Sequence, residues 1–338
     1  MTSYRRAGVD LEGADRHVTA ISSIVTGTWS DRVVGDFGGF AAGIELPEGY
    51  RRPVLMLSTD GVGTKLALAA ATGRWTGVGH DLVAMCVDDL AAAGARPLAF
   101  VDYMAVGALE PTRDTAIVES VAAACQAVGA ALLGGETAEH PGVMRPDEVD
   151  LAGAALGVVE RGDQIDGAGV RPGDSIIAFP SPNLRSNGFS LVRQVFAGTD
   201  LDQTCPGEDA SLGEVLLRPS VLYTPWALAA VDAGGVRGAA HITGGGIPGN
   251  LPRTLPAGCG AELDPASWTI PNVFRVISDR GGVGWDDMAT TFNLGIGFCL
   301  VVAPDSIEAV LSSTEAVDSR VIGTVVEGGG IRFRRPLG

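Results

Sequence analysis

Three acidic side chains in the first half of the chain follow short apolar runs that read as strands. Asp60, Asp102 and Glu136 each come just after such a run, with two glycines before Glu136. Carboxylates that are brought together repel one another unless a cation neutralises them, and Mg²⁺ bridging nucleotide phosphates is a common solution. The pattern predicts a magnesium and nucleotide site where these strands end. The alternative is that each acid only caps the turn that follows it.

The residues after Asp60 resemble a phosphate-binding turn. Gly61 and Gly63 can expose backbone N–H groups at the start of a predicted helix, and Lys65 supplies a positive charge. The spacing is not that of a Walker A loop, which needs G-x-x-x-x-G-K followed by Ser or Thr. An ordinary turn between a strand and a helix has a similar sequence, so both interpretations stay open.

A further carboxylate lies within a predicted helix over residues 81–94. Apolar residues such as Leu82 and Met85 share one face of this helix, and Asp89 falls on the same face. Burying a carboxylate there costs several kcal/mol unless it is paired or bound to a metal. The position predicts a functional role for Asp89, with a buried salt bridge to an arginine as the alternative. Asp88 is expected to face solvent.

Two segments of the second half can present hydrogen-bond donors to a ligand. Residues 243–246, Thr-Gly-Gly-Gly, end a predicted strand, and successive N–H groups in such a turn form an anion-binding nest. A flexible loop is the alternative there. Residues 185–187, Arg-Ser-Asn, precede a predicted helix and can offer donors to a phosphate or an amide.

The elements that must position these residues alternate between strands and helices. The strands are predicted over 53–58, 97–101, 130–133, 151–159, 175–179, 239–243 and 294–302. The helices are predicted over 65–72, 81–94, 112–128, 190–196 and 219–233. This alternation predicts an α/β or layered α+β fold. The polar segment 161–174 predicts a boundary between an N-terminal domain, residues 1–165, and a C-terminal domain, residues 166–338.

The composition argues against several classes of protein. The chain has 338 residues, is 46% hydrophobic, and carries 24 basic against 40 acidic side chains, a net charge of −16. So acidic a chain is not expected to bind nucleic acid in general. Its longest apolar run, 294–303, is about half of the ~20 residues that a membrane-spanning helix needs. The N-terminus lacks the apolar segment of a secretory signal.

The numbers and spacing of the cysteines and histidines predict neither a disulfide framework nor a structural zinc site. Five cysteines, an odd number without a C-x-x-C pair, predict buried free thiols in a reducing compartment, and hence a cytoplasmic protein. Four scattered histidines do not suggest a structural zinc site.

A series of motifs, in order along the chain, resembles the aminoimidazole ribonucleotide synthetase family, also called the phosphoribosylformylglycinamidine cyclo-ligases. The motifs lie at residues 4–10, 38–40, 59–65, 80–90, 133–142, 186–193, 243–246 and 291–293. The resemblance implies an N-terminal α/β domain whose sheet pairs with that of a second subunit into a barrel, followed by a C-terminal α/β domain. A homodimer is therefore expected, with ATP and Mg²⁺ as cofactors.

The resemblance also implies a reaction. ATP phosphorylates the formamide oxygen of formylglycinamidine ribonucleotide, and an amidine nitrogen then attacks that carbon and expels phosphate, which closes the imidazole ring. An amide oxygen is a poor leaving group until it is phosphorylated, and a metal with backbone N–H groups stabilises the charge that is transferred.

The resemblance assigns roles to residues of this chain. The catalytic group is Asp60, Lys65, Asp89, Glu136 and Arg185, of which Asp60, Asp89 and Glu136 would hold Mg²⁺. The nucleotide-binding group is Gly38, Gly39, Gly61, Gly63, Thr64, Lys65, Asp102, Gly134, Gly135 and Thr137. The group that would face the phosphoribosylated substrate is Ser186, Asn187, Thr243, Gly244, Gly245 and Gly246.

The chain departs from the family pattern at three places. Arg185 stands where the family usually has histidine, and an arginine cannot be deprotonated to act as a general base. Ser22 stands where the family often has a lysine, and residues 34–39 lack the longer glycine run. Two alternatives to the cyclo-ligase therefore stay open. One is a diverged enzyme that activates another amide or phosphate acceptor, and the other is a nucleotide-binding pseudoenzyme.

Overall fold

The computed structural model describes residues 11–338, which form two compact units. The N-terminal unit comprises the described residues up to Leu90 together with Arg96–Glu160, and the C-terminal unit comprises Ala91–Ala95 and Arg161–Gly338. The whole motif at 4–10 lies outside the described residues. The chain is a two-domain α/β protein, as its pattern of strands and helices predicts.

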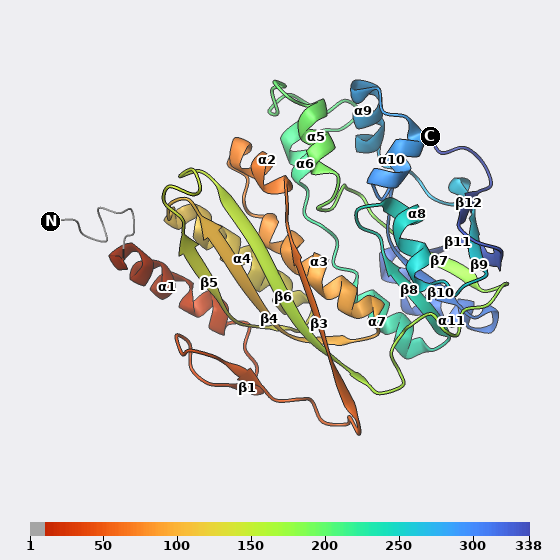
Figure 1. Cartoon of the computed structure of the whole chain (residues 1–338), viewed down its shortest axis with the longest axis horizontal. Coiled ribbons are helices and arrows are strands. Elements are labelled where there is room, and N and C mark those ends of the chain that lie inside the picture. Colours follow the sequence, from red (N-terminus) through yellow and green to blue (C-terminus); the bar gives the residue numbers. More distant parts are fainter. Residues whose placement is uncertain (1–10) are drawn as a thin grey trace. The chain divides into compact units, whose positions relative to one another are not determined.

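A four-stranded mixed sheet forms the centre of the N-terminal unit (Figure 1). In spatial order its strands are β3 (Pro53–Gly61), β6 (Val149–Glu160), β4 (Arg96–Val106) and β5 (Ala131–Glu139). Strand β6 runs antiparallel to both β3 and β4, whereas β4 and β5 are parallel. Strands β3, β4 and β5 therefore point the same way. Two short strands, β1 (Val33–Val34) and β2 (Gly43–Ile44), form a separate antiparallel pair.

Four helices belong to this unit: α1 (Leu11–Thr26), α2 (Lys65–Thr72), α3 (Val78–Ala92) and α4 (Pro111–Ala127). Helix α3 packs on one face of the sheet, where Leu82 and Phe100 are buried. Gly79 allows close packing of α3 on α4, because a Cβ atom there would lie 2.6 Å from the backbone nitrogen of Val121. The Glu110 carboxylate caps α4 by accepting hydrogen bonds from the first free N–H groups of the helix.

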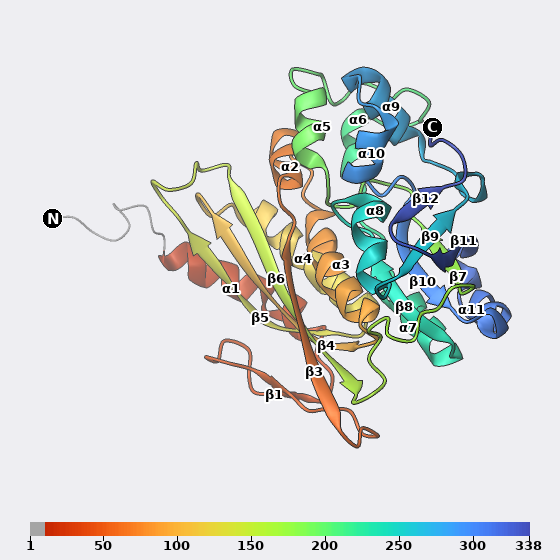
Figure 2. The same cartoon turned by 45° about the vertical axis from the view of Figure 1, so that its right-hand side comes forward.

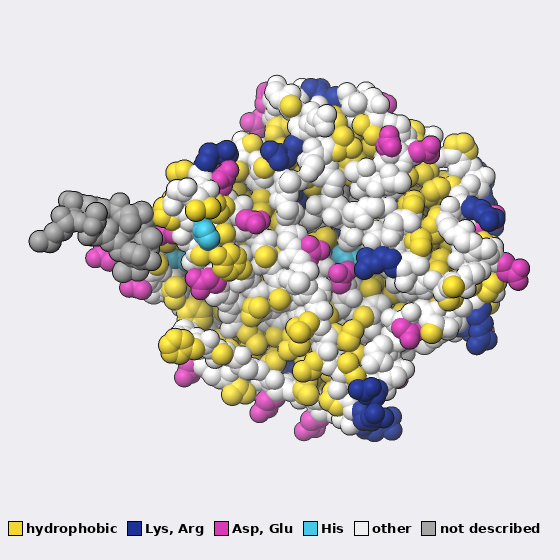
Figure 3. Space-filling model, viewed as in Figure 1, with side chains coloured by type: hydrophobic (Ala, Val, Ile, Leu, Met, Phe, Trp, Pro, Cys, Tyr) yellow, Lys and Arg dark blue, Asp and Glu magenta, His cyan; other side chains and the backbone are white. Residues whose placement is uncertain are grey.

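The opposite face of the four-stranded sheet is apolar and exposed in the single chain. Leu55, Leu57, Val101 and Tyr103 are 54%, 77%, 43% and 42% exposed. Figure 3 shows hydrophobic side chains gathered on this side of the molecule. We call these four residues and their surroundings the outer sheet face. Exposed apolar patches of this kind commonly mark interaction surfaces.

The C-terminal unit is built on a six-stranded sheet (Figures 1 and 2). In spatial order its strands are β12 (Ile331–Phe333), β9 (Cys259–Leu263), β11 (Arg320–Glu327), β7 (Ser175–Pro180), β10 (Ile296–Val302) and β8 (Val236–His241). Neighbouring strands are antiparallel except β12 and β9, which are parallel. Every residue of β10 is buried, as expected for a central strand that is covered on both faces.

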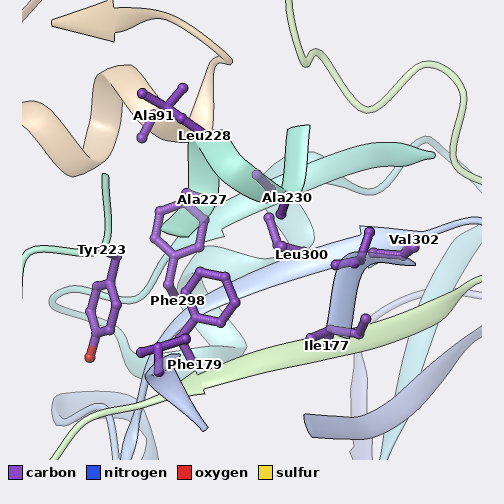
Figure 4. Packing of buried hydrophobic residues seen from close by; sticks show 13 residues of the cluster. Ala91, Ile177, Phe179, Tyr223, Ala227, Leu228, Ala230, Phe298, Leu300 and Val302 are labelled. Atoms are coloured by element: carbon purple, nitrogen blue, oxygen red, sulfur yellow. The ribbon is translucent and has the colours of Figure 1, made fainter. Parts of the chain in front are cut away.

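Seven α-helices accompany this sheet in the described chain. They are α5 (Phe189–Val195), α6 (Leu212–Leu217), α7 (Thr224–Ala233), α8 (Gly246–Asn250), α9 (Asn272–Gly281), α10 (Trp285–Thr291) and α11 (Ile307–Ser313). Short 3-10 helices lie at Leu251–Thr254, Pro265–Ser267, Pro304–Ser306 and Glu315–Val317. The core between β7, β10 and α7 includes Phe179, Tyr223 and Phe298, whose rings lie about 6 Å apart (Figure 4).

Several predicted elements are confirmed, and others need correction. The helix over 65–72 is α2, and the strand over 53–58 is the first part of β3. The predicted strand ends are wrong, because β3, β4 and β5 continue to Gly61, Val106 and Glu139. Asp60, Asp102 and Glu136 therefore lie inside strands, since pairing with neighbouring strands continues past them. The helix over 219–233 begins only at Thr224.

No helix in the described part of the chain is long and apolar enough to cross a membrane.

Candidate functional site

A cavity of about 780 Å³ lies in the N-terminal unit, beside edge strand β5. Helix α1 contributes an apolar wall that includes Val18, Ile21 and Val25, and residues 36–42 contribute a second wall. The volume falls within the range of roughly 300–1,000 Å³ that is typical of small-molecule sites. The cavity collects seven of the predicted nucleotide and metal residues: Gly38, Gly39, Asp102, Gly134, Gly135, Glu136 and Thr137.

Asp102 stands on β4 at the floor of this cavity. Its neighbours in register are Gly153 on β6 and Gly135 on β5. Gly135 is required there, because a Cβ atom would overlap the Asp102 carboxylate. Burial raises the pKa of Asp102 to about 7, because the charged carboxylate is desolvated. The cavity thus contains a carboxyl group that can be protonated near neutral pH.

His17 on α1 also lines the cavity, and the sequence analysis did not single it out. Its Nε2 lies 3.4 Å from the hydroxyl of Thr137 on β5. The side chain is 6% exposed, and burial lowers the pKa of the imidazole. Its Nδ1 has no hydrogen-bond partner in the described part of the chain. The signal available in the sequence was its spacing of four and eight residues from Ile21 and Val25, which places the three side chains on one helix face.

Asp60 and Asp89 both lie near enough to the thiol of Cys86 to affect its pKa. Burial raises the pKa of Cys86 to about 12, and the charges of Asp60 and Asp89 add to the increase. The hydroxyl of Ser58 lies 3.5 Å from an oxygen of Asp89, at the edge of hydrogen-bond distance. Two carboxylates therefore gather beside β3, a pattern suited to a divalent cation with oxygen ligands.

The predicted environments of Asp88 and Asp89 in α3 are both wrong. Asp89 is exposed, whereas Asp88 is fully buried. The prediction assumed that α3 buries a single face, but every residue from Asp81 to Asp88 is buried. A helix that is covered almost all round gives no reliable periodicity.

Glu136 lies apart from the other two predicted metal ligands. It is in register with Tyr103, so it shares the outer sheet face. Asp60 and Glu136 stand three strands apart, which is roughly 14 Å at the usual strand spacing. Residues 11–338 contain no group of three or more His, Cys, Asp or Glu side chains placed to hold a metal. The expected triad is therefore not assembled within one chain, because the strand order separates its members.

Lys65 has a different environment from the one predicted. Its side chain is fully buried, and its Nζ lies 2.5 Å from a carboxylate oxygen of Asp81. The predicted helix over 81–94 is α3, which begins earlier, at Val78, so that Asp81 lies inside its first turn. Among the residues that the structure describes, the cavity lining does not include Lys65 or the turn residues Gly61, Gly63 and Thr64. This ion pair ties the start of α2 to α3.

The five cysteines are free thiols, as predicted, and all but the half-buried Cys259 are buried. Burial raises the pKa of Cys86 and Cys299 to about 12 each, so these thiols stay protonated and unreactive at neutral pH.

In the C-terminal unit, the two predicted substrate segments lie next to each other. A Cβ atom at Gly244 would lie 3.7 Å from the amide nitrogen of Asn187. The Ser186 hydroxyl and the Asn187 amide oxygen are buried and have no hydrogen-bond partner among the described residues. Buried polar atoms without partners are costly, so these two atoms suggest a ligand that completes their hydrogen bonds.

The glycine turn is held in place by Asn250, a residue that the sequence analysis did not assign. The Asn250 amide donates to the carbonyl oxygens of Gly244 and Gly246 at 3.1 and 2.9 Å. The Thr243 hydroxyl donates to the Asn250 amide oxygen at 3.3 Å. Gly246 is required by packing, since a Cβ atom there would overlap the carbonyl oxygen of Ala289. The turn is a fixed structure, so the alternative of a flexible loop is not supported.

Arg185 is fully buried. Its guanidinium donates to the carbonyl oxygen of Val221 at 2.8 Å and lies 2.9 Å from Nε2 of His241. It also lies 4.7 Å from the ring centre of Tyr223. These contacts are all internal to the C-terminal unit, so they favour a positioning role over the predicted direct catalytic role.

Comparison with known proteins identifies the family. Residues 41–159 match the family described as AIR synthase related protein, N-terminal domain, and residues 171–335 match the corresponding C-terminal domain. The phosphoribosylformylglycinamidine cyclo-ligase of Myxococcus xanthus is 46% identical over 335 residues, which cover 97% of each chain. The chain belongs to the phosphoribosylformylglycinamidine cyclo-ligase family. Another cyclo-ligase, from Gloeobacter violaceus, is 47% identical over 335 residues and covers 98% of this chain and 99% of its own.

Solved structures show that the cyclo-ligase fold is shared more widely. The thiamine-monophosphate kinase of Stenotrophomonas maltophilia matches with a TM-score of 0.70 at 21% identity, over 97% of each chain. The hydrogenase maturation protein HypE, in a complex with ATP, matches with a TM-score of 0.66 at 17% identity, over 95% of this chain and 90% of that one. At these identities the likeness concerns the fold alone.

Proposed function

We propose that the chain is an ATP-dependent cyclo-ligase that converts formylglycinamidine ribonucleotide into aminoimidazole ribonucleotide, with release of ADP and phosphate. The observation that carries this proposal is the 46% identity over 97% of both chains to the Myxococcus xanthus cyclo-ligase. The cavity beside β5 and the two adjacent loops of the C-terminal unit supply places for a nucleotide and for an acceptor.

The cavity beside β5 is the proposed ATP site. Its apolar wall on α1 suits the base and ribose, and Gly38, Gly39, Gly134 and Gly135 leave room for close approach of the backbone to phosphates. Its volume of about 780 Å³ is large enough for a nucleotide. The role of the N-terminal domain, residues 1–165, is therefore proposed to be nucleotide binding and dimerisation.

Asp60 and Asp89 are the proposed Mg²⁺ ligands of one chain. Both carboxylates are exposed and lie near the buried thiol of Cys86, and carboxylate oxygens are the ligands that Mg²⁺ prefers. A magnesium ion bound there would neutralise charge on the transferred phosphoryl group.

The outer sheet face is the proposed dimer surface, and a second copy of this chain is its occupant. The exposed side chains of Leu55, Leu57, Val101 and Tyr103 would be buried by the sheet of that copy. Glu136 shares this face. We therefore expect Glu136 of one copy to join the metal site of the other around the end of β3, because Asp60 and Asp89 lie on the α3 side of the sheet, opposite to the outer sheet face.

The acceptor is proposed to bind at the loops around Ser186 and residues 243–246. The Ser186 hydroxyl and the Asn187 amide oxygen can hold polar groups of the substrate, because both atoms are buried without partners in the described structure. The fixed glycine turn offers backbone N–H groups without a reorganisation cost. Phosphorylation of the formamide oxygen then makes that oxygen a leaving group, and the held amidine nitrogen attacks the carbon.

The test is ADP release by the purified protein with formylglycinamidine ribonucleotide, ATP and Mg²⁺. Asp60→Asn and Glu136→Gln should each lower turnover by about 10³-fold, as loss of a charge-stabilising group does. If the metal shell spans two copies, mixing the two inactive variants should restore about a quarter of wild-type activity, because half of the random dimers then contain one intact site.

Glu119→Gln on the exposed surface of α4 is the matched control and should keep full activity. ADP release with a different acceptor only would support the diverged enzyme, and nucleotide binding without ADP release would support the pseudoenzyme. A mixture that stays inactive would contradict the shared metal shell.

A further inference from the structure

A buried contact joins Arg185 to His241 in the C-terminal unit. The guanidinium Nη2 lies 2.9 Å from the imidazole Nε2, and the two side chains are 0% and 5% exposed. The family resemblance predicts a histidine at the position of Arg185, whereas the structure shows an arginine in contact with His241. The geometry of this contact determines which nitrogen of the His241 ring carries the proton.

An arginine side chain has N–H donors and no acceptor, and it keeps its proton at all accessible pH values. The hydrogen bond to His241 can therefore form in one direction only, with Nε2 as the acceptor. An accepting Nε2 carries no proton, so the ring is the neutral form with its proton on Nδ1.

The guanidinium is itself fixed from several sides. It donates to the carbonyl oxygen of Val221 at 2.8 Å and stacks 4.7 Å from the ring centre of Tyr223. The backbone of Arg185 adopts φ 60°, a conformation that non-glycine residues rarely adopt, and its N–H donates to the Asn183 side chain at 3.0 Å. Such backbone strain persists only where surrounding contacts hold it, and it often accompanies functional sites.

The pair connects the two loops assigned to the acceptor. Arg185 directly precedes Ser186 and Asn187, and His241 is the last residue of β8, two positions before Thr243. The imidazole also faces the ring of Phe298 on β10, with ring centres 6.3 Å apart. Movement of either partner would therefore displace one of these loops relative to the other.

We propose that Arg185 is a positioning residue that holds His241 as the neutral Nδ1–H tautomer and locks the loop at Ser186 against the glycine turn. The link to the acceptor rests on the function proposed above, whereas the link to the tautomer does not. An arginine can take this position because the task is to donate one fixed hydrogen bond, not to exchange a proton.

The first test is nitrogen NMR of the histidine rings in the full-length protein near neutral pH. With four histidines in the chain, His241→Gln identifies the signals of His241. Nε2 of wild-type His241 should be unprotonated and Nδ1 protonated. A protonated Nε2 in the wild-type protein would overturn the proposal, whatever the variants do.

Variants of Arg185 show whether its hydrogen bond sets the tautomer of His241 or whether the side chain only fills space. Arg185→Met should allow the proton to move to Nε2, and Arg185→Lys, which keeps a charged donor, should restore the wild-type signals at least in part. Arg193→Met on the exposed surface of α5 is the control and should leave the signals unchanged. If the Met variant folds and keeps the wild-type tautomer, Arg185 does not set it.

Steady-state kinetics then test whether Arg185 holds the loop at Ser186 in the position that binds the acceptor. Arg185→Met should raise KM for formylglycinamidine ribonucleotide by about tenfold or more, as loss of a charged hydrogen bond does, with KM for ATP unchanged. Equal increases in both KM values would indicate general loosening and would contradict the proposal. If the wild-type protein does not use this acceptor, the proposed function fails, while the NMR result still decides the tautomer.

Discussion

The two units of the chain build their functional groups in different ways. The N-terminal unit uses charges: Asp60, Asp89 and Asp102 lie on or beside a sheet whose outer face is exposed. The C-terminal unit presents neutral polar groups, such as Ser186 and Asn250, in loops that are fixed by internal hydrogen bonds, including those of the buried Arg185. Its central strand β10 is buried throughout.

This difference predicts different sensitivities. A unit that concentrates carboxylates and exposes an apolar sheet face should respond to charge, pH and protein concentration. A unit that holds neutral loops by buried hydrogen bonds should respond mainly to changes in packing and geometry. Three changes within the N-terminal unit test this contrast.

The largest effect is expected for the buried ion pair between Lys65 and Asp81. Lys65→Met leaves the Asp81 carboxylate buried beside an apolar side chain, which should lower the free energy of unfolding by about 3–5 kcal/mol. Denaturant unfolding of the purified variant measures this loss. If Lys65 instead served a bound phosphate, the variant would lose nucleotide affinity with little loss of stability.

Two controls sharpen this result. The exposed pair of Arg145 and Glu148 has side chains that are 73% and 40% exposed, so Arg145→Met should change stability by less than about 1 kcal/mol. Replacing both Lys65 and Asp81 by apolar residues should recover part of the loss, because neither buried charge then remains. A double variant as unstable as Lys65→Met would show that shape rather than charge determines the cost.

A smaller effect is expected for Asp102, and it depends on pH. The folded-state pKa of about 7 lies above the ordinary value of 3.8, so the folded protein binds the proton more tightly than the unfolded chain. The contribution of this group to stability is complete below about pH 4 and is lost as the pH rises toward 7. Without nucleotide, Asp102→Asn should therefore be more stable than the wild type at pH 8, by about 2–4 kcal/mol.

The comparison variant is Asp150→Asn, at an exposed position of β6. Unfolding measured between pH 4 and pH 8 should keep the wild-type slope in Asp150→Asn and flatten in Asp102→Asn. If the free energy of unfolding depends on pH in the same way in all three proteins, Asp102 is ionised like an exposed carboxylate. The N-terminal unit would then not owe any sensitivity to pH to this residue.

The sequence predicts many of the elements and glycine turns of both units, because these features depend on residues that are close together in the chain. Short apolar runs and the alanine-rich segments report local structure, so the helix at 65–72 and the cores of β3, β4 and β6 were predictable. The glycines at 134, 135 and 244–246 likewise mark places where backbone or ligand must come close, and both segments lie at candidate sites.

The sequence alone does not give the strand order or the contacts between residues that lie far apart in the chain. The strand order β3-β6-β4-β5 separates Glu136 from Asp60, and only the structure gives that order. The pairing of Lys65 with Asp81 and of Arg185 with His241 joins residues 16 and 56 positions apart, through contacts that no local pattern reports. The periodicity of α3 does not predict which of its acids is buried, because tertiary packing covers every residue from Asp81 to Asp88.

The smallest effect on folding, and the clearest test of the exposed face, is expected for Leu57→Asp. Leu57 is 77% exposed in the single chain, so the charge should change the free energy of monomer unfolding by less than about 0.5 kcal/mol. In a dimer that buries this side chain, the same carboxylate would lack a partner and should weaken association by about tenfold or more. Sedimentation at a series of concentrations measures the association, with Val143→Asp, 82% exposed and outside the four strands, as the control. If both variants dimerise like the wild type, the outer sheet face is not the dimer surface, and Glu136 cannot reach a second copy through it.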